Sequence, residues 1–251
     1  MNLNLKPAYR FRGIYSQFML SIPYAATQED VIDKIYFMSP AEEGFNYFDW
    51  VFDQSLDDSF VGVDCYNPGT WGSNKTVGNG CIENSHLFRG MKDAVRRIKI
   101  KDHIQKKVDD FCAKNLTART LGVHVRTADM NIYHPHFGVF YTKDYIAKIR
   151  EILDTEYVEN IFVASDNKAS IDEIRGKFGA VVSYDCELRE KDENFRNDNM
   201  HVEHFTEYKL WEEAFVEMLI LSRCYYFLCR VSNLANAAIL FSDDLKKIYR
   251  L

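Results

Sequence analysis

The stretch Leu121-Gly-Val-His-Val-Arg-Thr-Ala-Asp129 is a short apolar run that delivers three polar side chains, those of His124, Arg126 and Asp129. Its β-branched and apolar residues up to Val125 predict a strand buried in a sheet. Burying a guanidinium without a counter-ion costs on the order of several kcal/mol, so we expect an anion beside Arg126. That anion is either a carboxylate of the protein or a phosphate of a ligand.

Strands and helices alternate around this run. We expect strands at residues 160–164, 180–183 and 225–229, and helices at 141–153, 169–178, 208–221 and 232–241. An amphipathic helix or helix pair is expected over 91–113, a helix over 13–26, a strand over 31–38, irregular structure over 39–90 and a charged loop over 187–204. The alternation from residue 118 onward predicts an α/β fold with a parallel sheet that binds its ligand at the carboxyl ends of the strands.

The composition narrows the classes of function. Of the 251 residues 47% are hydrophobic, enough for the core of one large domain or two small ones, and the net charge of −6 argues against a nucleic-acid partner. Six cysteines without a C-x-x-C pair predict reduced thiols and no structural zinc. There is no Asp-x-Asp motif for a metal-bridged diphosphate, so no metal is expected. Without a signal peptide or a long apolar segment, the sequence predicts a cytoplasmic protein with no transmembrane segment.

Polar side chains follow three of the expected strands. Because the carboxyl ends of parallel strands meet at one edge of a sheet, these side chains can surround a single ligand. A helix beginning at Ser232 offers free backbone N–H groups to a diphosphate, Arg126 can hold it with two parallel hydrogen bonds, and Asp166 can accept from a base or a ribose hydroxyl. The pattern indicates a nucleotide site without a G-x-G-x-x-G or P-loop motif. Its members are His124, Arg126, Asp129, Ser165, Asp166, Arg230, Ser232 and Asn233.

The motif His124-Val-Arg-Thr-Ala-Asp129 resembles the H-x-R-x-x-D motif of the α1,2/α1,6/protein-O fucosyltransferase superfamily, which uses GDP-fucose. Residues 161–167, 216–222 and 229–233 are similar to later motifs of this family in the same order, and residues 13–18 to its glycine loop. The resemblance implies a GT-B-like α/β fold of two facing Rossmann-like domains, the C-terminal one a doubly wound parallel sheet. We expect an acceptor-side α/β domain over 1–115 and a domain that binds the nucleotide sugar over 116–251.

The resemblance also implies roles for individual residues. Arg126 would bind the donor diphosphate and act in catalysis, and His124 and Asp166 would contact guanine. For the catalytic base the nearby candidates are Asp129, His134 and His136, and we favour Asp129, which could act if the loop after the strand folds over the sugar. The remaining donor-binding residues would be Gly13, Ser165, Arg230, Val231, Ser232 and Asn233, with His134 and His136 as acceptor-side candidates and Glu217 supporting the site from an apolar helix. Many relatives have a second arginine where this chain has Thr127.

Structural roles compete with these functional ones. Arg126 could form an ion pair with Asp129 or Glu217, His124 could be a core histidine, and Asp166 could cap the following helix. At the level of the protein, the leading interpretation is an inverting, metal-independent glycosyltransferase that moves fucose from GDP-fucose to a glycan hydroxyl and needs no cofactor. The alternatives are the same fold with another nucleotide-sugar donor, or a nucleotide- or glycan-binding module without turnover.

Overall fold

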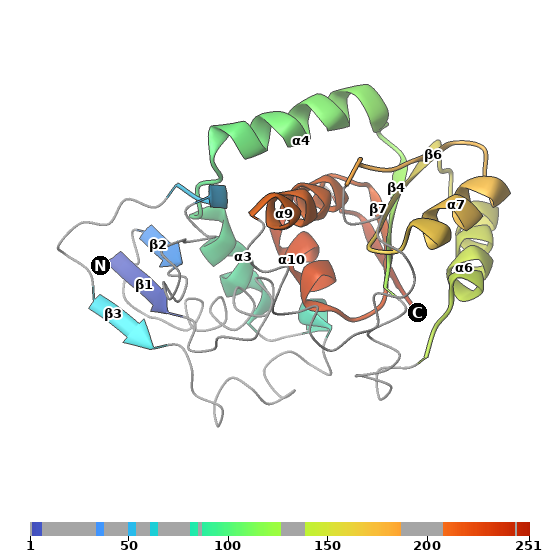
Figure 1. Cartoon of the computed structure of the whole chain (residues 1–251). Helices are drawn as coiled ribbons and strands as arrows, with labels where there is room; N and C mark the ends of the chain where they lie inside the picture. Colours follow the sequence, from blue (N-terminus) through green and yellow to red (C-terminus); the bar gives the residue numbers. More distant parts are fainter. Residues whose placement is uncertain are drawn as a thin grey trace. The chain divides into compact units, whose positions relative to one another are not determined.

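The computed structural model describes residues 2–6, 34–37, 50–53, 61–64, 81–84, 87–126, 139–186, 208–243 and 245–251 (Figure 1). The chain divides into two compact units. The first comprises Met1–Lys106, Asn199–Phe215 and Ser232–Phe241, and the second comprises Lys107–Asp198, Val216–Val231 and Ser242–Leu251.

The second unit is built on a parallel sheet of five strands. The order across the sheet is β6-β5-β4-β7-β8, which in chain order reads third, second, first, fourth, fifth, the order of a Rossmann fold without its sixth strand. In such a sheet the connections leaving the first and fourth strands run to opposite sides, so a crevice forms between their carboxyl ends. Here these two strands are β4 and β7. The strand bounds are β4 (Thr120–Val125), β5 (Asn160–Ser165), β6 (Val181–Val182), β7 (Tyr226–Cys229) and β8 (Lys247–Arg250).

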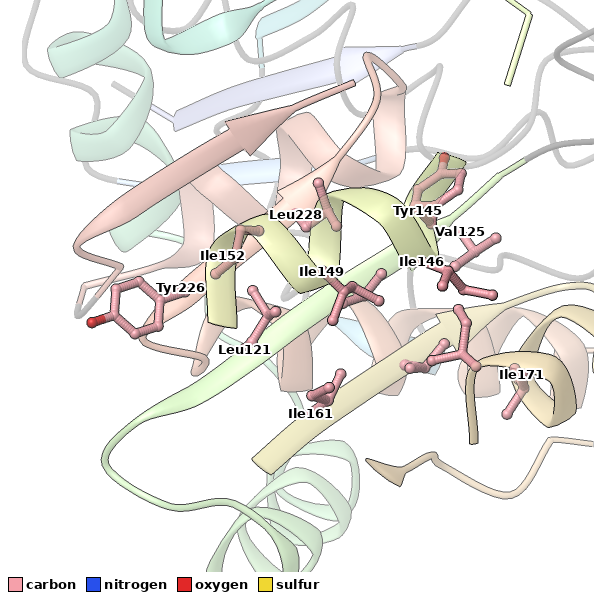
Figure 2. Packing of buried hydrophobic residues seen from close by; sticks show 13 residues of the cluster. Leu121, Val125, Tyr145, Ile146, Ile149, Ile152, Ile161, Ile171, Tyr226 and Leu228 are labelled. Atoms are coloured by element: carbon pink, nitrogen blue, oxygen red, sulfur yellow. The ribbon is translucent and has the colours of Figure 1, made fainter. Parts of the chain in front are cut away.

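One face of this sheet is covered by α6 (Thr142–Thr155) and α7 (Lys168–Lys177), which lie side by side (Figure 1). The alternation of a strand sends every second residue to this face, and those residues form a buried cluster with the inward side of both helices (Figure 2). The cluster consists of Leu121, Val123, Val125, Tyr145, Ile146, Ile149, Ile152, Ile161, Val163, Ile171, Ile174, Tyr226 and Leu228.

The opposite face of the sheet carries the intervening residues. Phe162 of β5 meets Phe111 of α4 (Asp102–Asn115) edge to face, with 5.6 Å between the ring centroids. Gly122 of β4 faces Leu221 of α9 (Tyr208–Ser222) and Cys224, which follows this helix. Both faces of the sheet are therefore covered, which explains why β4 and β7 read as continuous apolar runs.

The first unit contains a second parallel sheet with the order β2-β1-β3. Its helix α3 packs against α10, whose nine residues include three alanines that allow close approach. Phe52 and Phe215 of α9 meet edge to face, and the Trp50 indole donates a 2.6 Å hydrogen bond to the Glu212 carboxylate. The bounds are β1 (Asn2–Lys6), β2 (Lys34–Phe37), β3 (Val61–Asp64), the 3-10 turn η2 (Ile82–Asn84), α3 (Phe88–Arg96) and α10 (Asn233–Phe241).

The α/β class and the parallel sheet predicted from the sequence are confirmed. For residues 91–113 the sequence predicts one helix or a pair, and the structure has the pair α3 and α4. The helix expected over 13–26 and the loop expected over 187–204 lie outside the described residues. The assignment of acceptor and donor roles to 1–115 and 116–251 stays a prediction. Within the described part of the chain, no helix has both the length and the apolar character needed to cross a bilayer.

Candidate active site

The end of β4 carries two of the predicted site residues. His124 is buried, and it pairs in register with Ala164 of β5 on one side and Cys229 of β7 on the other. It therefore belongs to the central strand of the sheet. Arg126 is the first residue after β4, and its side chain is 30% exposed. The guanidinium therefore reaches the surface at the carboxyl edge of the sheet, where a ligand can meet it.

An ion pair joins Arg126 to Asp166, which follows β5. The Arg126 Nη1 and Asp166 Oδ2 atoms are 4.0 Å apart, and the Asp166 side chain is 47% exposed. An ion pair of this length between exposed groups contributes about 0–1 kcal/mol, so a ligand can displace it at small cost. The sequence offers Asp129 and Glu217 as partners of Arg126, but its spacing does not reveal the pair with Asp166, because that pair depends on the adjacency of β4 and β5.

The turn after β5 uses Asn167, and not Asp166, to cap the next helix. Asn167 is the N-cap of α7, and its Oδ1 accepts a hydrogen bond from Ser170 N at 3.3 Å. The buried Ser165 hydroxyl accepts from Asn167 N at 3.1 Å and shapes the same turn. The alternative in which Asp166 caps the helix is therefore wrong, because the chain enters α7 one residue later.

Arg230, the residue after β7, has a fully buried side chain. Its Nη1 donates to the backbone oxygen of Arg126 at 3.3 Å, and its guanidinium lies over the Phe140 ring, 5.2 Å from the centroid. A guanidinium over an aromatic face gains electrostatic attraction from the ring. The side chain thus links the ends of β4 and β7 at the edge where the crevice of a Rossmann-type sheet lies. Contact of Arg230 with a donor stays a prediction.

Tyr145, which the sequence predicts only as a core residue, also lies at the carboxyl edge of the sheet, beside Arg126. The Tyr145 hydroxyl of α6 lies 3.2 Å from the backbone nitrogen of Arg126 and 3.4 Å from its backbone oxygen. Burial raises the pKa of Tyr145 well above its usual value, so the hydroxyl stays neutral and can both donate and accept. A tyrosine at helical spacing signals only an apolar face, so no sequence pattern reveals this contact.

Ser232 directly precedes α10, close to the helix start that the sequence predicts. Its Oγ accepts from Ala235 N at 3.1 Å and its carbonyl from Asn236 N at 2.9 Å, so it is the N-cap of a helix in the first unit. Asn233 at the first helical position is exposed. The N-terminus of a helix attracts anions through its free N–H groups and its dipole.

The other predicted residues divide into described and undescribed ones. Val231 is half-buried, and Glu217 lies buried on α9. Gly13, Asp129, His134 and His136 lie outside the described residues. Among the residues that are described, no group of three or more His, Cys, Asp or Glu side chains is placed to hold a metal ion.

No protein-family model and no curated protein sequence matches the chain. Solved structures do match. NodZ α-1,6-fucosyltransferase soaked with GDP-fucose aligns with a TM-score of 0.60 at 16% identity over 96% of this chain and 93% of that chain. Fucosyltransferase NodZ from Bradyrhizobium gives 0.60 at 15% identity over 96% and 94%. POFUT1 in complex with GDP gives 0.52 at 13% identity over 100% and 98%.

These likenesses, together with the parallel sheet, show that the chain has an α/β, GT-B-like fold, which it shares with those solved structures. At the carboxyl edge of that sheet, the end of β4 carries a partly exposed arginine, Arg126, and the end of β5 carries an exposed aspartate, Asp166.

Proposed function

We propose that this protein is an inverting, metal-independent glycosyltransferase that transfers fucose from GDP-fucose to a hydroxyl of a glycan. One observation carries the proposal: Arg126 presents a partly exposed guanidinium at the carboxyl end of β4, in a fold shared with structures that were solved with GDP-fucose or GDP. Because the guanidinium is partly exposed and its ion pair with Asp166 is long, Arg126 can exchange this carboxylate for a phosphate of the donor.

The chemistry follows from what each group can supply. Inversion needs a single displacement at the anomeric carbon, during which negative charge builds on the departing diphosphate. Arg126 would neutralise that charge, and the start of α10 at Ser232 offers N–H groups to the same kind of anion. Asp129 would take the proton from the acceptor hydroxyl as a general base. His134 and His136 are the other candidates for the acceptor side.

Recognition of the base would fall to Asp166 and His124. Guanine presents adjacent N–H donors on its pairing edge, and an exposed carboxylate such as that of Asp166 can accept from two donors at once. Uracil has only one such donor, so the site should prefer GDP to UDP. Gly13, Ser165, Arg230, Val231 and Asn233 complete the proposed donor site.

A thermal-shift screen of nucleoside diphosphates tests the proposal, because a ligand that binds the folded state raises the melting temperature by mass action. We expect GDP to raise the melting temperature more than UDP or CMP, with no change on adding EDTA. GDP release from GDP-fucose should then require an acceptor glycan. A preference for UDP would favour another nucleotide-sugar donor. GDP binding without release across a panel of acceptors would favour a non-catalytic module, and loss of binding in EDTA would overturn metal independence.

A further inference from the structure

The backbone of Arg126 lies just beyond the hydrogen-bonded ladders of the sheet. On one side, pairing of β4 ends with Val125 opposite Ser165, and on the other with His124 opposite Cys229. A backbone N–H or C=O group at such a point needs a partner from outside the ladder if it is shielded from water. At Arg126 these partners come from two side chains.

Tyr145 of α6 and Arg230 at the end of β7 supply them. The Tyr145 hydroxyl bridges the nitrogen and the oxygen of Arg126 at 3.2 and 3.4 Å, and Arg230 Nη1 donates to the same oxygen at 3.3 Å. Both side chains are fully buried, so the surrounding protein restricts their motion. The Tyr145 ring is held by the aliphatic cluster between the sheet and α6 (Figure 2). The position of the Arg126 backbone is therefore set by rigid parts of the core.

The geometry points to Tyr145 as a positioning residue that fixes the Arg126 backbone so that its guanidinium meets the donor diphosphate. The inference rests on the proposed function. A displacement of about 1 Å at a reacting group can lower the rate about a hundredfold. Loss of the Tyr145 hydroxyl should therefore reduce the reaction rate more than it reduces folding stability. Tyr145 touches no substrate in this scheme and acts only through Arg126.

The substitution Tyr145→Phe isolates the hydroxyl, because the phenylalanine ring keeps the packing of the cluster. Tyr226→Phe is the matched control. Tyr226 belongs to the same cluster but stands at the opposite end of it (Figure 2), next to Leu121 in register, and its hydroxyl donates to Glu156 Oε2 at 3.1 Å. Both variants lose one tyrosine hydroxyl from the same core, and only Tyr145→Phe loses it at Arg126.

Three measurements should be made on both variants and the wild type: GDP affinity by calorimetry, kcat and KM for GDP-fucose, and hydrogen exchange at the Arg126 amide without nucleotide. In Tyr145→Phe we expect the amide to exchange faster, GDP affinity to fall about three- to tenfold, the scale of one hydrogen bond, and kcat to fall at least about tenfold. Tyr226→Phe should match the wild type in all three.

Wild-type exchange at Arg126 in Tyr145→Phe would overturn the inference, and so would faster exchange with unchanged GDP affinity and kcat. Equal effects in the two tyrosine variants would also overturn it, because they would report general destabilisation. If the wild type neither binds GDP nor releases it from GDP-fucose, the proposed function fails. The claim that Tyr145 positions Arg126 for a donor diphosphate then fails as well. The exchange rate then decides whether Tyr145 holds the Arg126 backbone.

Discussion

Gly122 of β4 packs against Cys224 so closely that a Cβ atom added to the glycine would lie 2.9 Å from the Cys224 Sγ atom and 3.0 Å from its Cβ. Cys224 is fully buried, so its sulfur has no open space to move into. The contact holds the end of α9 against the sheet at the middle of β4, two residues before His124.

Gly122→Ala should therefore destabilise the protein by about 1–3 kcal/mol, the usual cost of overpacking a core. Urea unfolding measures this. Gly176→Ala is the matched control, because a Cβ at Gly176 of α7 would meet nothing within 4 Å. In that exposed helical position alanine should stabilise by about 0.5–1 kcal/mol. Destabilisation of equal size in both variants would contradict the close contact at Cys224.

Arg126→Ala should abolish transfer and weaken GDP binding by about 1.5–3 kcal/mol, the worth of a charge-assisted hydrogen bond. Loss of the ion pair with Asp166, which is long and exposed, should itself cost folding less than about 1 kcal/mol. Calorimetry and urea unfolding separate the two effects. Arg223→Ala, which removes a 3.5 Å surface ion pair with Asp109 in the same unit, is the control and should leave GDP binding unchanged. If Arg126→Ala unfolds while addition of Glu217→Ala restores stability, Arg126 has a structural role.

The neighbouring residues Asp166 and Asn167 should respond differently to alanine. Asn167→Ala removes the side chain that caps α7 and should cost about 1 kcal/mol of unfolding free energy. Asp166→Ala removes the long ion pair with Arg126 and no cap, so it should cost less unfolding free energy than Asn167→Ala while reducing the preference for GDP over UDP. Urea unfolding and thermal shifts with both nucleotides test this. A larger stability loss in Asp166→Ala than in Asn167→Ala would contradict the assignment.

Glu156 should make the second unit sensitive to acid. Its carboxylate accepts from Lys247 Nζ at 2.7 Å and from the hydroxyls of Tyr249 and Tyr226 at 2.6 and 3.1 Å, which ties the end of α6 to β8 and β7. The hydrogen bond from Lys247, followed by those of the tyrosines, lowers the pKa of Glu156 from its ordinary 4.5 to about 2. A lowered pKa stabilises the folded state above pH 4.5, and this stabilisation is lost as the pH falls toward 2.

Glu156→Gln should therefore melt at a lower temperature than the wild type at pH 7, and the difference should shrink between pH 4.5 and pH 2. Thermal melts across this range measure it. Glu151→Gln, which removes an exposed ion pair with Lys148 on α6, controls for the loss of a surface carboxylate. A difference between wild type and Glu156→Gln that is constant down to pH 2 would show that the charge of Glu156 is not what stabilises this junction.

Asp129→Asn should retain GDP binding and lose at least about a hundredfold in turnover, the usual scale of a general base. His134→Ala and His136→Ala should each cost less. Initial rates of GDP release at saturating acceptor, beside calorimetric GDP affinity, measure this. Normal turnover in Asp129→Asn with an inactive histidine variant would move the role of base to that histidine. Full activity in all three would place the base in the N-terminal half of the chain.

The sequence by itself determined the α/β class, the central strand at β4 and the arginine that follows it. Apolar runs such as 121–125 and 225–229 signal strands locally, and polar residues directly after them are bound to lie at the carboxyl edge of a parallel sheet. The N-cap role of Ser232 is equally local, because it depends on a hydroxyl meeting the N–H groups of its own helix.

Only the tertiary structure decided the partners of these residues. β8 was not predicted, because its four residues have no pattern of their own and become a strand by pairing with β7 and by the ties of Lys247 and Tyr249 to Glu156. Arg230 is buried against the backbone of Arg126, from which it is 104 positions away in the sequence. Tyr145, which contacts the same backbone, is 19 positions away. Such contacts depend on which strands and helices become neighbours, and the free energy that selects them comes from burial of the whole core, which no local pattern of residues contains.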